Sequence, residues 1–157
     1  MPTPTELADN FLAGASALRQ AVRGMTREQL VARPVPGRWS TLEVVCHIAD
    51  FDPVLIDRMK RIIALDGPPL LLAADENQFL KTLAYHDRDP EEELTLVESG
   101  RKQMARIIRG LKPEQLLRTG CHNVKGLQTL EQIIQTATNH IPHHLKFVAE
   151  KRKALGV

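Results

Sequence analysis

The sequence has little cysteine, few aromatic residues and no long apolar runs. Its two cysteines, Cys46 and Cys121, lack CxxC spacing and are too few for a disulfide framework, so we expect a reducing compartment. Aromatic residues make up 4% of the chain, which favours aliphatic helix packing over an aromatic-rich β-sandwich. No apolar run approaches the roughly 20 residues of a membrane helix, and no basic-then-apolar leader is visible. These absences predict a cytoplasmic protein with no membrane partner.

An excess of charge of one sign is also lacking. The 21 basic and 19 acidic residues are mixed along the chain and give a formal net charge of +2. This balance supplies no strong field for a polyanion, so we expect no nucleic-acid partner. The basic residues from Lys146 to Lys153 are interpreted as a solvated last helical turn. A chain of 157 residues has the size of one domain, and we expect a single domain over residues 1–157.

Apolar residues recur at helical spacing in four long segments, which predicts an all-α protein, a four-helix bundle. The second of these segments starts with Ser40 and Glu43 in the pattern of a capping box. Glycine and proline separate the segments. The predicted helices span about residues 5–23, 40–65, 89–111 and 128–153.

The connection between the second and third helices, residues 66–88, is long enough to run back along the bundle. We expect a short helix within it near residues 76–84, and the second and third helices can then be parallel. A faint repeat relates residues 23–30 to residues 109–116. If it is real, it predicts that the first two helices form one hairpin and the last two form a related copy.

Three of the six histidines fall within the segment 139–144. At about 100° per residue, His140 and His144 lie on the core-facing stripe of the fourth helix, whereas His143 turns toward solvent. The i, i+4 spacing lets one helix offer two imidazole nitrogens to one metal ion. His47 is the candidate for a third ligand, because antiparallel second and fourth helices bring it level with His144. Three imidazoles leave positions on the ion for water or substrate, as catalytic metal sites do.

Other roles are open for these residues and their neighbours. Each of the three histidines could instead be an ordinary polar side chain bonded to a carbonyl group or to water. Glu43 could be a general base, although its capping-box role is favoured, and Asp50 could orient an imidazole, although we expect it to face solvent. Trp39 is expected to anchor the start of the second helix. The histidines expected at the surface are His86, His122 and His143.

Four stretches of the chain together resemble the DinB/YfiT-like superfamily, and the resemblance covers about residues 5–152. None is specific alone, but their order and spacing are; they are residues 35–50, 75–79, 120–126 and 140–144. The resemblance implies an up-down-down-up bundle with a long crossover between the second and third helices. It also implies a three-histidine metal site, which maps onto His47, His140 and His144. Relatives of this kind are divalent-metal-dependent thiol transferases, isomerases that use a low-molecular-weight thiol, or hydrolases.

The residues and the resemblance together predict a divalent-metal-dependent enzyme that activates a thiol or water against a small electrophilic substrate. Zinc or nickel is the expected metal, although imidazoles also suit iron and copper, and a low-molecular-weight thiol is a candidate cosubstrate. The alternative is a non-catalytic bundle that binds metal or ligand. A homodimer is expected because the second helix is apolar over a wide arc, unless the crossover covers that arc. The flanking residues of the arc are Val44, Phe51, Leu55 and Ile62.

Pro142, between His140 and His144, departs from the family pattern, as does the continuation Leu145-Lys-Phe147. Proline inside a helix removes an amide donor and clashes with the preceding turn, at a cost of about 3 kcal/mol. We therefore expect a kink here, which could free the Thr138 carbonyl toward the metal or disturb the alignment of His140 with His144.

Overall fold

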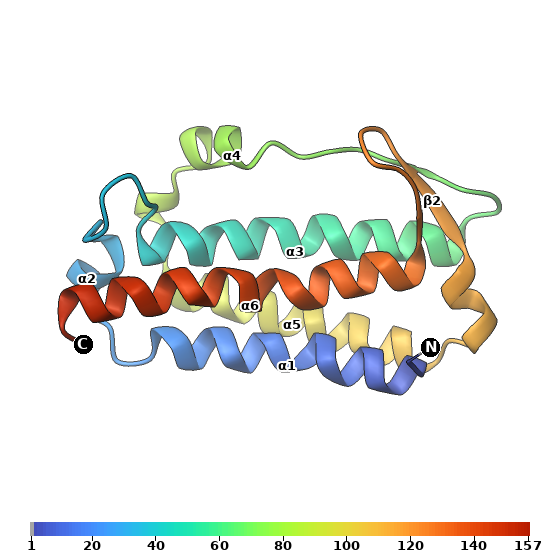
Figure 1. The fold of residues 1–157 in the computed structure, drawn as a ribbon, viewed down its shortest axis with the longest axis horizontal. Helices are drawn as coiled ribbons and strands as arrows, with labels where there is room; N and C mark the ends of the chain where they lie inside the picture. Colours follow the sequence, from blue (N-terminus) through green and yellow to red (C-terminus); the bar gives the residue numbers. More distant parts are fainter. Residues whose placement is uncertain (1) are drawn as a thin grey trace.

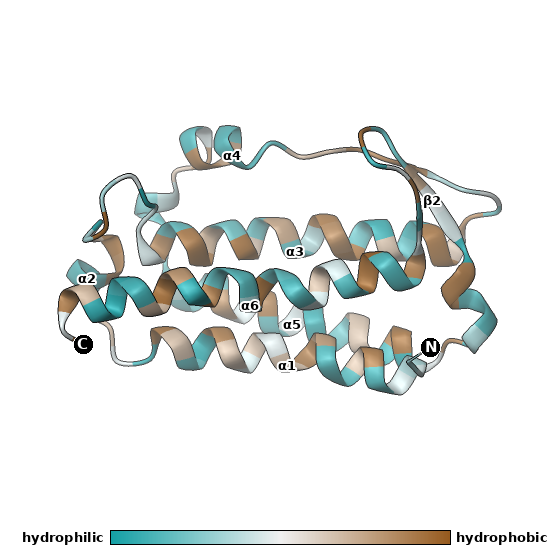
Figure 2. Cartoon of the chain, viewed as in Figure 1, coloured by the Kyte–Doolittle hydropathy of each residue, from teal (hydrophilic) through white to brown (hydrophobic). Residues whose placement is uncertain are grey.

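Four long helices run side by side along the molecule in the computed structural model, which describes residues 2–157 (Figure 1). They are α1 (Pro4–Val22), α3 (Thr41–Ala64), α5 (Pro90–Arg109) and α6 (Leu130–Leu155). Hydrophobic and hydrophilic residues alternate along each of them, as the amphipathic pattern predicts (Figure 2). The predicted four-helix bundle is confirmed.

Side-chain caps fix where the long helices begin. Ser40 and Glu43 form the predicted capping box: the Glu43 amide lies 3.1 Å from the Ser40 hydroxyl, and the Ser40 amide lies 2.6 Å from the Glu43 carboxylate. The Asp89 carboxylate accepts hydrogen bonds from the first amides of α5, and Pro90 follows in the first turn. At the other end of the chain, α6 stops at Gly156, which has a φ of 73°. Local sequence therefore sets the helix ends to within about two residues.

The helices follow the predicted up-down-down-up order (Figure 1). α1 and α6 point one way along the bundle, and α3 and α5 point the other way. A crossover from the end of α3 returns along the outside of the bundle to the start of α5. It contains β1 (Leu70–Leu71), α4 (Glu76–Thr82) and the 3₁₀ turn Tyr85–Asp87. The expected short helix is therefore present and ends two residues earlier than predicted.

The predicted hairpins are wrong, because the two long helices of each predicted pair, α1 with α3 and α5 with α6, lie diagonally across the bundle. α1 packs against α5 and α6, and α3 packs against the same two helices. The connections are long enough for this: α1 leads into α3 through α2 (Arg27–Val31), and the crossover lets α5 enter between α1 and α3. The faint repeat instead marks a short helical turn after α1 and after α5, α2 in the first case and the 3₁₀ turn Pro113–Leu117 in the second.

A small three-stranded sheet that the sequence analysis did not predict closes one end of the bundle. β2 (Thr119–His122) pairs in parallel with β1 and antiparallel with β3 (Gly126–Thr129). Gly120 leaves room for the neighbouring side chains, because a Cβ at this position would lie 2.7 Å from Leu71 Cδ1. The sheet ties the start of the crossover to the turn that precedes α6. None of the helices between residues 2 and 157 combines the length and hydropathy of a membrane span.

One ion pair lies in the middle of the aliphatic core. The Arg101 guanidinium donates to both carboxylate oxygens of Asp52, at 2.5 and 2.9 Å. It also donates to the carbonyl oxygens of Phe11, at 2.7 Å, and Ala137, at 2.9 Å. Gly14 gives it room, since a Cβ there would lie 2.5 Å from an Arg101 nitrogen. Arg101 on α5 is thus bonded to each of the other three long helices.

Candidate metal centre

The three histidines predicted as metal ligands meet between α3 and α6. His47 Nε2 lies 3.0 Å from His140 Nε2, which lies 3.2 Å from His144 Nε2. One nitrogen from each ring can be chosen so that all three lie within 4.8 Å of one another. His47 is 1% exposed, and the other two are partly buried. The predicted alignment of antiparallel helices therefore brings the rings together, and Pro142 does not disturb the register of His140 with His144.

The distances from His140 Nε2 to its two neighbours are close to the ligand spacing of a small divalent ion. A tetrahedral ion with metal–nitrogen bonds of about 2.0–2.1 Å holds its ligand nitrogens about 3.3 Å apart. Without an ion, His140 Nε2 carries either one proton or one lone pair, so it cannot form a good hydrogen bond to both neighbours. An ion that accepts one lone pair from each ring satisfies all three nitrogens. The donor set therefore fits a divalent metal with imidazole ligands.

Burial keeps these rings in the form that binds metal. Burial, together with the neighbouring His140, lowers the pKa of His47 to about 3, and burial together with the Arg101 charge lowers the pKa of His140 to about 4. Burial likewise lowers the pKa of His144 to about 3, with His140 adding to the effect. All three imidazoles are therefore neutral near pH 7 and offer lone pairs without first losing a proton.

Aromatic packing, rather than hydrogen bonds, orients the rings. The Nδ1 atoms of His47 and His140 are buried and have no hydrogen-bond partner within residues 2–157. The His47 ring instead lies between Trp39, with ring centres 5.2 Å apart, and Phe51, at 4.5 Å. Phe79 of α4 packs on Phe51 at 5.6 Å. The crossover therefore supports the site from outside the bundle.

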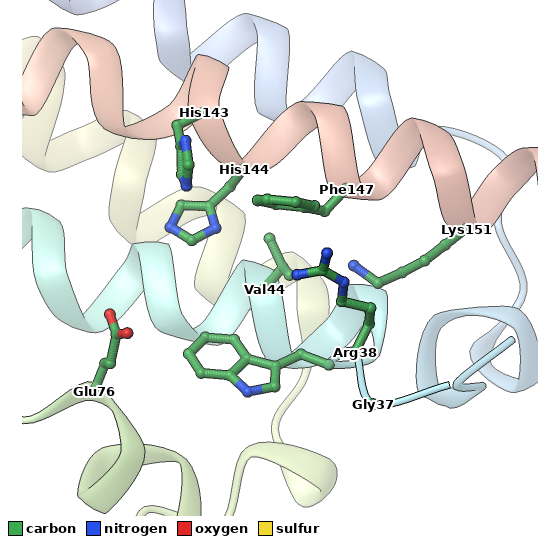
Figure 3. A pocket seen from close by; sticks show the side chains of 9 residues that line it. Gly37, Arg38, Val44, Glu76, His143, His144, Phe147 and Lys151 are labelled. Carbon is green, nitrogen blue, oxygen red and sulfur yellow. The ribbon is translucent and has the colours of Figure 1, made fainter. Parts of the chain in front are cut away.

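A pocket of about 260 Å³ opens beside His144 (Figure 3). Trp39, Val44 and Phe147 form its apolar walls. Trp39 precedes the α3 cap, as predicted, and in addition lines this pocket. The polar lining residues besides His144 are Arg38, Glu76, His143 and Lys151. A small molecule in this pocket would therefore lie next to the histidine cluster.

Glu43 keeps its capping-box role and does not serve as a base at this site. It is 1% exposed and accepts hydrogen bonds from the Ser40 amide and the Arg33 guanidinium. His86 Nε2 lies 2.9 Å from its carboxylate, although His86 is at the surface as expected. Burial alone would raise the pKa of Glu43, but the hydrogen bonds from Arg33 and Ser40 hold it below its usual value. The carboxylate is therefore ionised and fully engaged.

Three predictions of solvent exposure are wrong. Asp50 has a side chain only 16% exposed and pairs with Arg88 at 2.8 Å, because the crossover folds over this part of α3. His122 is 5% exposed, and its Nδ1 accepts the backbone amides of the two residues at the tip of the β2–β3 turn. Lys151 is 2% exposed, so the segment Lys146–Lys153 is not simply a solvated last turn. His143 is exposed as predicted, and it also lines the pocket.

Two features of the site were not predicted. Lys151 lies on the same face of α6 as His144 and Phe147, at i, i+3, i+7 spacing, so helical periodicity could have placed it there. Arg38 and Glu76 come from the turn before α3 and from α4. No local sequence pattern predicts that these two segments lie beside α6, because their position depends on the tertiary fold.

The fold and the histidine cluster define a class of four-helix bundles with a three-imidazole centre. The model of the DinB superfamily matches residues 10–148, and the chain belongs to this family. The chain is 27% identical to YfiT of Bacillus subtilis over 140 residues, 88% of this chain and 78% of YfiT. The solved structure of YfiT, described as a probable metal-dependent hydrolase with an unusual four-helix bundle topology, superposes with a TM-score of 0.89 and 25% identity. That match covers 98% of this chain and 87% of YfiT.

Two further comparisons agree with this fold. A relative from Oceanobacillus iheyensis, whose provisional name is also metal-dependent hydrolase, is 28% identical over 138 residues, 87% of this chain and 79% of its own. A mycothiol-dependent maleylpyruvate isomerase superposes with a TM-score of 0.71 at 12% identity, covering 93% of this chain and 62% of the isomerase. At that identity the isomerase shows the shared fold alone.

Proposed function

We propose that this protein is a divalent-metal-dependent enzyme, and that His47, His140 and His144 hold its metal ion. The observation that carries the proposal is the convergence of three neutral imidazoles, with His140 Nε2 lying 3.0 Å from His47 Nε2 and 3.2 Å from His144 Nε2. Relatives named as metal-dependent hydrolases support it. Zinc or nickel is the proposed ion, although imidazole ligands also suit iron and copper.

When bound, such an ion lowers the pKa of water or a thiol and supplies a nucleophile near neutral pH. The chain's own residues do the rest. Trp39 and Phe51 hold the His47 ring in place, and Phe147 and Val44 give the pocket an apolar wall. A pocket of about 260 Å³ limits the substrate to a small molecule. We therefore propose hydrolysis or thiol transfer on a small electrophilic substrate.

A low-molecular-weight thiol is the proposed cosubstrate if the reaction is a transfer. The structural likeness to a mycothiol-dependent isomerase motivates this choice, because both chains have the same fold. Water is the competing nucleophile, as the hydrolase names of the nearer relatives suggest. Incubating the zinc- or nickel-loaded protein with activated esters and amides, with and without added thiol, separates the two.

Purification without an affinity tag followed by metal analysis tests the proposal. We expect about one equivalent of a divalent ion per chain and turnover of at least one electrophile by the loaded protein. Stoichiometric metal without any turnover would favour the alternative, a non-catalytic metal- or ligand-binding bundle. Absence of metal binding at all would overturn the proposal.

The cellular setting and assembly of the enzyme are further proposals. The thiol chemistry of Cys46 and Cys121, both free, suits a reducing cytoplasm. A homodimer was expected because the apolar arc of α3 needs to be covered. Val44, Leu55 and Ile62 of that arc are already buried within one chain, which weakens the argument for a dimer. Light scattering over a wide concentration range decides the matter. A dimer gives twice the monomer mass of 17.6 kDa, and a constant 17.6 kDa would remove it.

A further inference from the structure

Two cations share one end of the pocket beside the histidine cluster. Figure 3 shows the Lys151 ammonium and the Arg38 guanidinium reaching toward one another, with Glu76 at the opposite end. The two come from segments far apart in the chain, Lys151 from the last turns of α6 and Arg38 from the turn before α3. The fold therefore builds a positive subsite next to the metal ligands.

Lys151 is buried without a partner of opposite charge. It is 2% exposed, and it forms neither an ion pair nor a hydrogen bond from its side chain within residues 2–157. Glu43 and Glu150 are the acidic groups that act on it, but Glu43 is already engaged by Arg33, Ser40 and His86. Burial lowers the pKa of Lys151, with Arg38 adding to the effect, so holding a cation here is costly.

Arg38 is held in place by stacking rather than by an ion pair. Its guanidinium lies 5.1 Å from the centre of the Phe147 ring. This contact leaves the donors of the guanidinium edge free, and a guanidinium edge matches the two oxygens of a carboxylate. Because the guanidinium is already held in position, binding an anion costs little side-chain ordering.

We propose that the pocket binds its small substrate through a carboxylate group that lies between Arg38 and Lys151. A carboxylate at this position supplies the counter-charge that Lys151 lacks and relieves the repulsion between the two cations. The rest of the molecule then extends along Trp39 and Phe147 toward His144. That orientation, with the reacting atom at the metal, rests on the proposed function, whereas the anion subsite does not.

Trp39 makes the subsite measurable without metal or turnover. It is the only tryptophan of the chain and lines the pocket, so its fluorescence reports on binding there. The probes are 3-mercaptopropionate and its methyl ester, which differ in the negative charge. Chelator-treated, metal-free protein is titrated with each by calorimetry, and Trp39 fluorescence is recorded in parallel. We expect the acid to bind about tenfold or more tightly than the ester and to change the Trp39 signal.

Variants test the two cations separately. Lys151→Met keeps the apolar stem and removes the charge, and Arg38→Gln removes the guanidinium at an exposed position where folding is not at risk. Each should lose most of the preference for the acid, with little change for the ester. Lys153→Met, two residues further along α6 and exposed, is the matched control and should keep the preference.

Several outcomes would overturn the subsite. They are equal affinity for acid and ester, no binding of the acid, binding of the acid without a Trp39 response, and a folded Arg38→Gln variant that keeps the full preference. Equal losses in Lys151→Met and Lys153→Met would also overturn it, because the effect would then be general electrostatics. A zinc titration of the same preparation keeps the proposals apart: a protein that prefers the acid but binds no zinc would contradict the metal centre alone.

Discussion

Arg101 and His140 lie close together in the bundle interior, but the chain satisfies their polar groups to different degrees. Arg101 donates to both oxygens of Asp52 and to the carbonyl oxygens of Phe11 and Ala137. His140 has only two other imidazoles within reach of its Nε2 and no partner within residues 2–157 for its Nδ1. Arg101 and Asp52 are buried, whereas His140 is partly buried, and only the Arg101 cluster has a partner for each of its polar groups within residues 2–157.

This difference separates a structural cluster from a ligand site. A buried polar group costs free energy unless it is hydrogen-bonded, so a chain rarely leaves one unpaired without a reason. Arg101 bonds α5 to α1, α3 and α6, and no further partner is needed there. The three imidazoles, and Lys151 nearby, gain partners only when something binds. Substitutions in the Arg101 cluster should therefore change folding stability, whereas substitutions in the imidazole cluster should change ligand binding.

The largest effect is expected from breaking the satisfied cluster. Arg101→Met leaves the Asp52 carboxylate buried without its counter-ion, which should lower the free energy of unfolding by about 3–5 kcal/mol. Burial raises the pKa of Asp52 even with Arg101 present, so the variant should retain Asp52 in its protonated form over a wider pH range. Urea unfolding of the metal-free protein measures the change.

A double variant provides the control for Arg101. Arg101→Met combined with Asp52→Leu removes both charges and should recover much of the lost stability. A single variant that unfolds within about 1 kcal/mol of the wild type would show that the ion pair is not a structural element of the core.

Metal binding is the next largest effect, because it completes the second cluster. His47→Ala, His140→Ala and His144→Ala should each abolish tight metal binding, whereas His86→Ala and His143→Ala should leave it intact. A metal that binds only the folded state adds about 4 kcal/mol at a thousandfold excess over its Kd. Chelation should therefore lower the Tm of the wild type and leave that of the triple variant unchanged.

Two results would contradict this assignment. One is loss of metal from His86→Ala or His143→Ala equal to that from His47→Ala, His140→Ala or His144→Ala, since neither His86 nor His143 belongs to the three-histidine group. The other is a wild-type Tm that does not respond to a chelator.

The sequence predicted the histidine cluster because helical geometry decides it. The i, i+4 spacing places His140 and His144 on one face, and helix length sets the depth of His47. Predictions failed where the burial of a residue depends on segments far away in the sequence. His122 is buried by the pairing of strands only two to four residues long, and Asp50 is covered by the crossover. The diagonal placement of α1 and α3 depends on connection lengths, which apolar periodicity does not encode.

Acid should affect the imidazole cluster through the stability of the metal-free protein. The pKa values of about 3 to 4 in the folded state lie below the ordinary 6.5, so the unfolded chain binds more protons between these limits. The stability associated with neutral rings is present above about pH 6.5 and is lost as the pH falls toward 4. Chelated wild type should therefore lose more stability over this range than a His47→Gln/His140→Gln/His144→Gln variant. Thermal melts measure the stability of the two proteins at each pH. If stability falls by the same amount in both, the rings are not buried in their neutral form.

The smallest effect is expected at Pro142, between His140 and His144. α6 runs from Leu130 to Leu155 through this proline, whose missing amide leaves the Thr138 carbonyl without its helical donor. Pro142→Ala restores that donor, so the metal-free protein should gain stability if the proline is only tolerated strain. If the proline sets the approach of His140 to His144, the same variant should bind metal more weakly. Melts and metal titrations of Pro142→Ala, beside Asn139→Ala as an exposed control on α6, separate these effects. Lower metal-free stability together with unchanged metal affinity would contradict both, because the proline would then stabilise α6 without any part in the site.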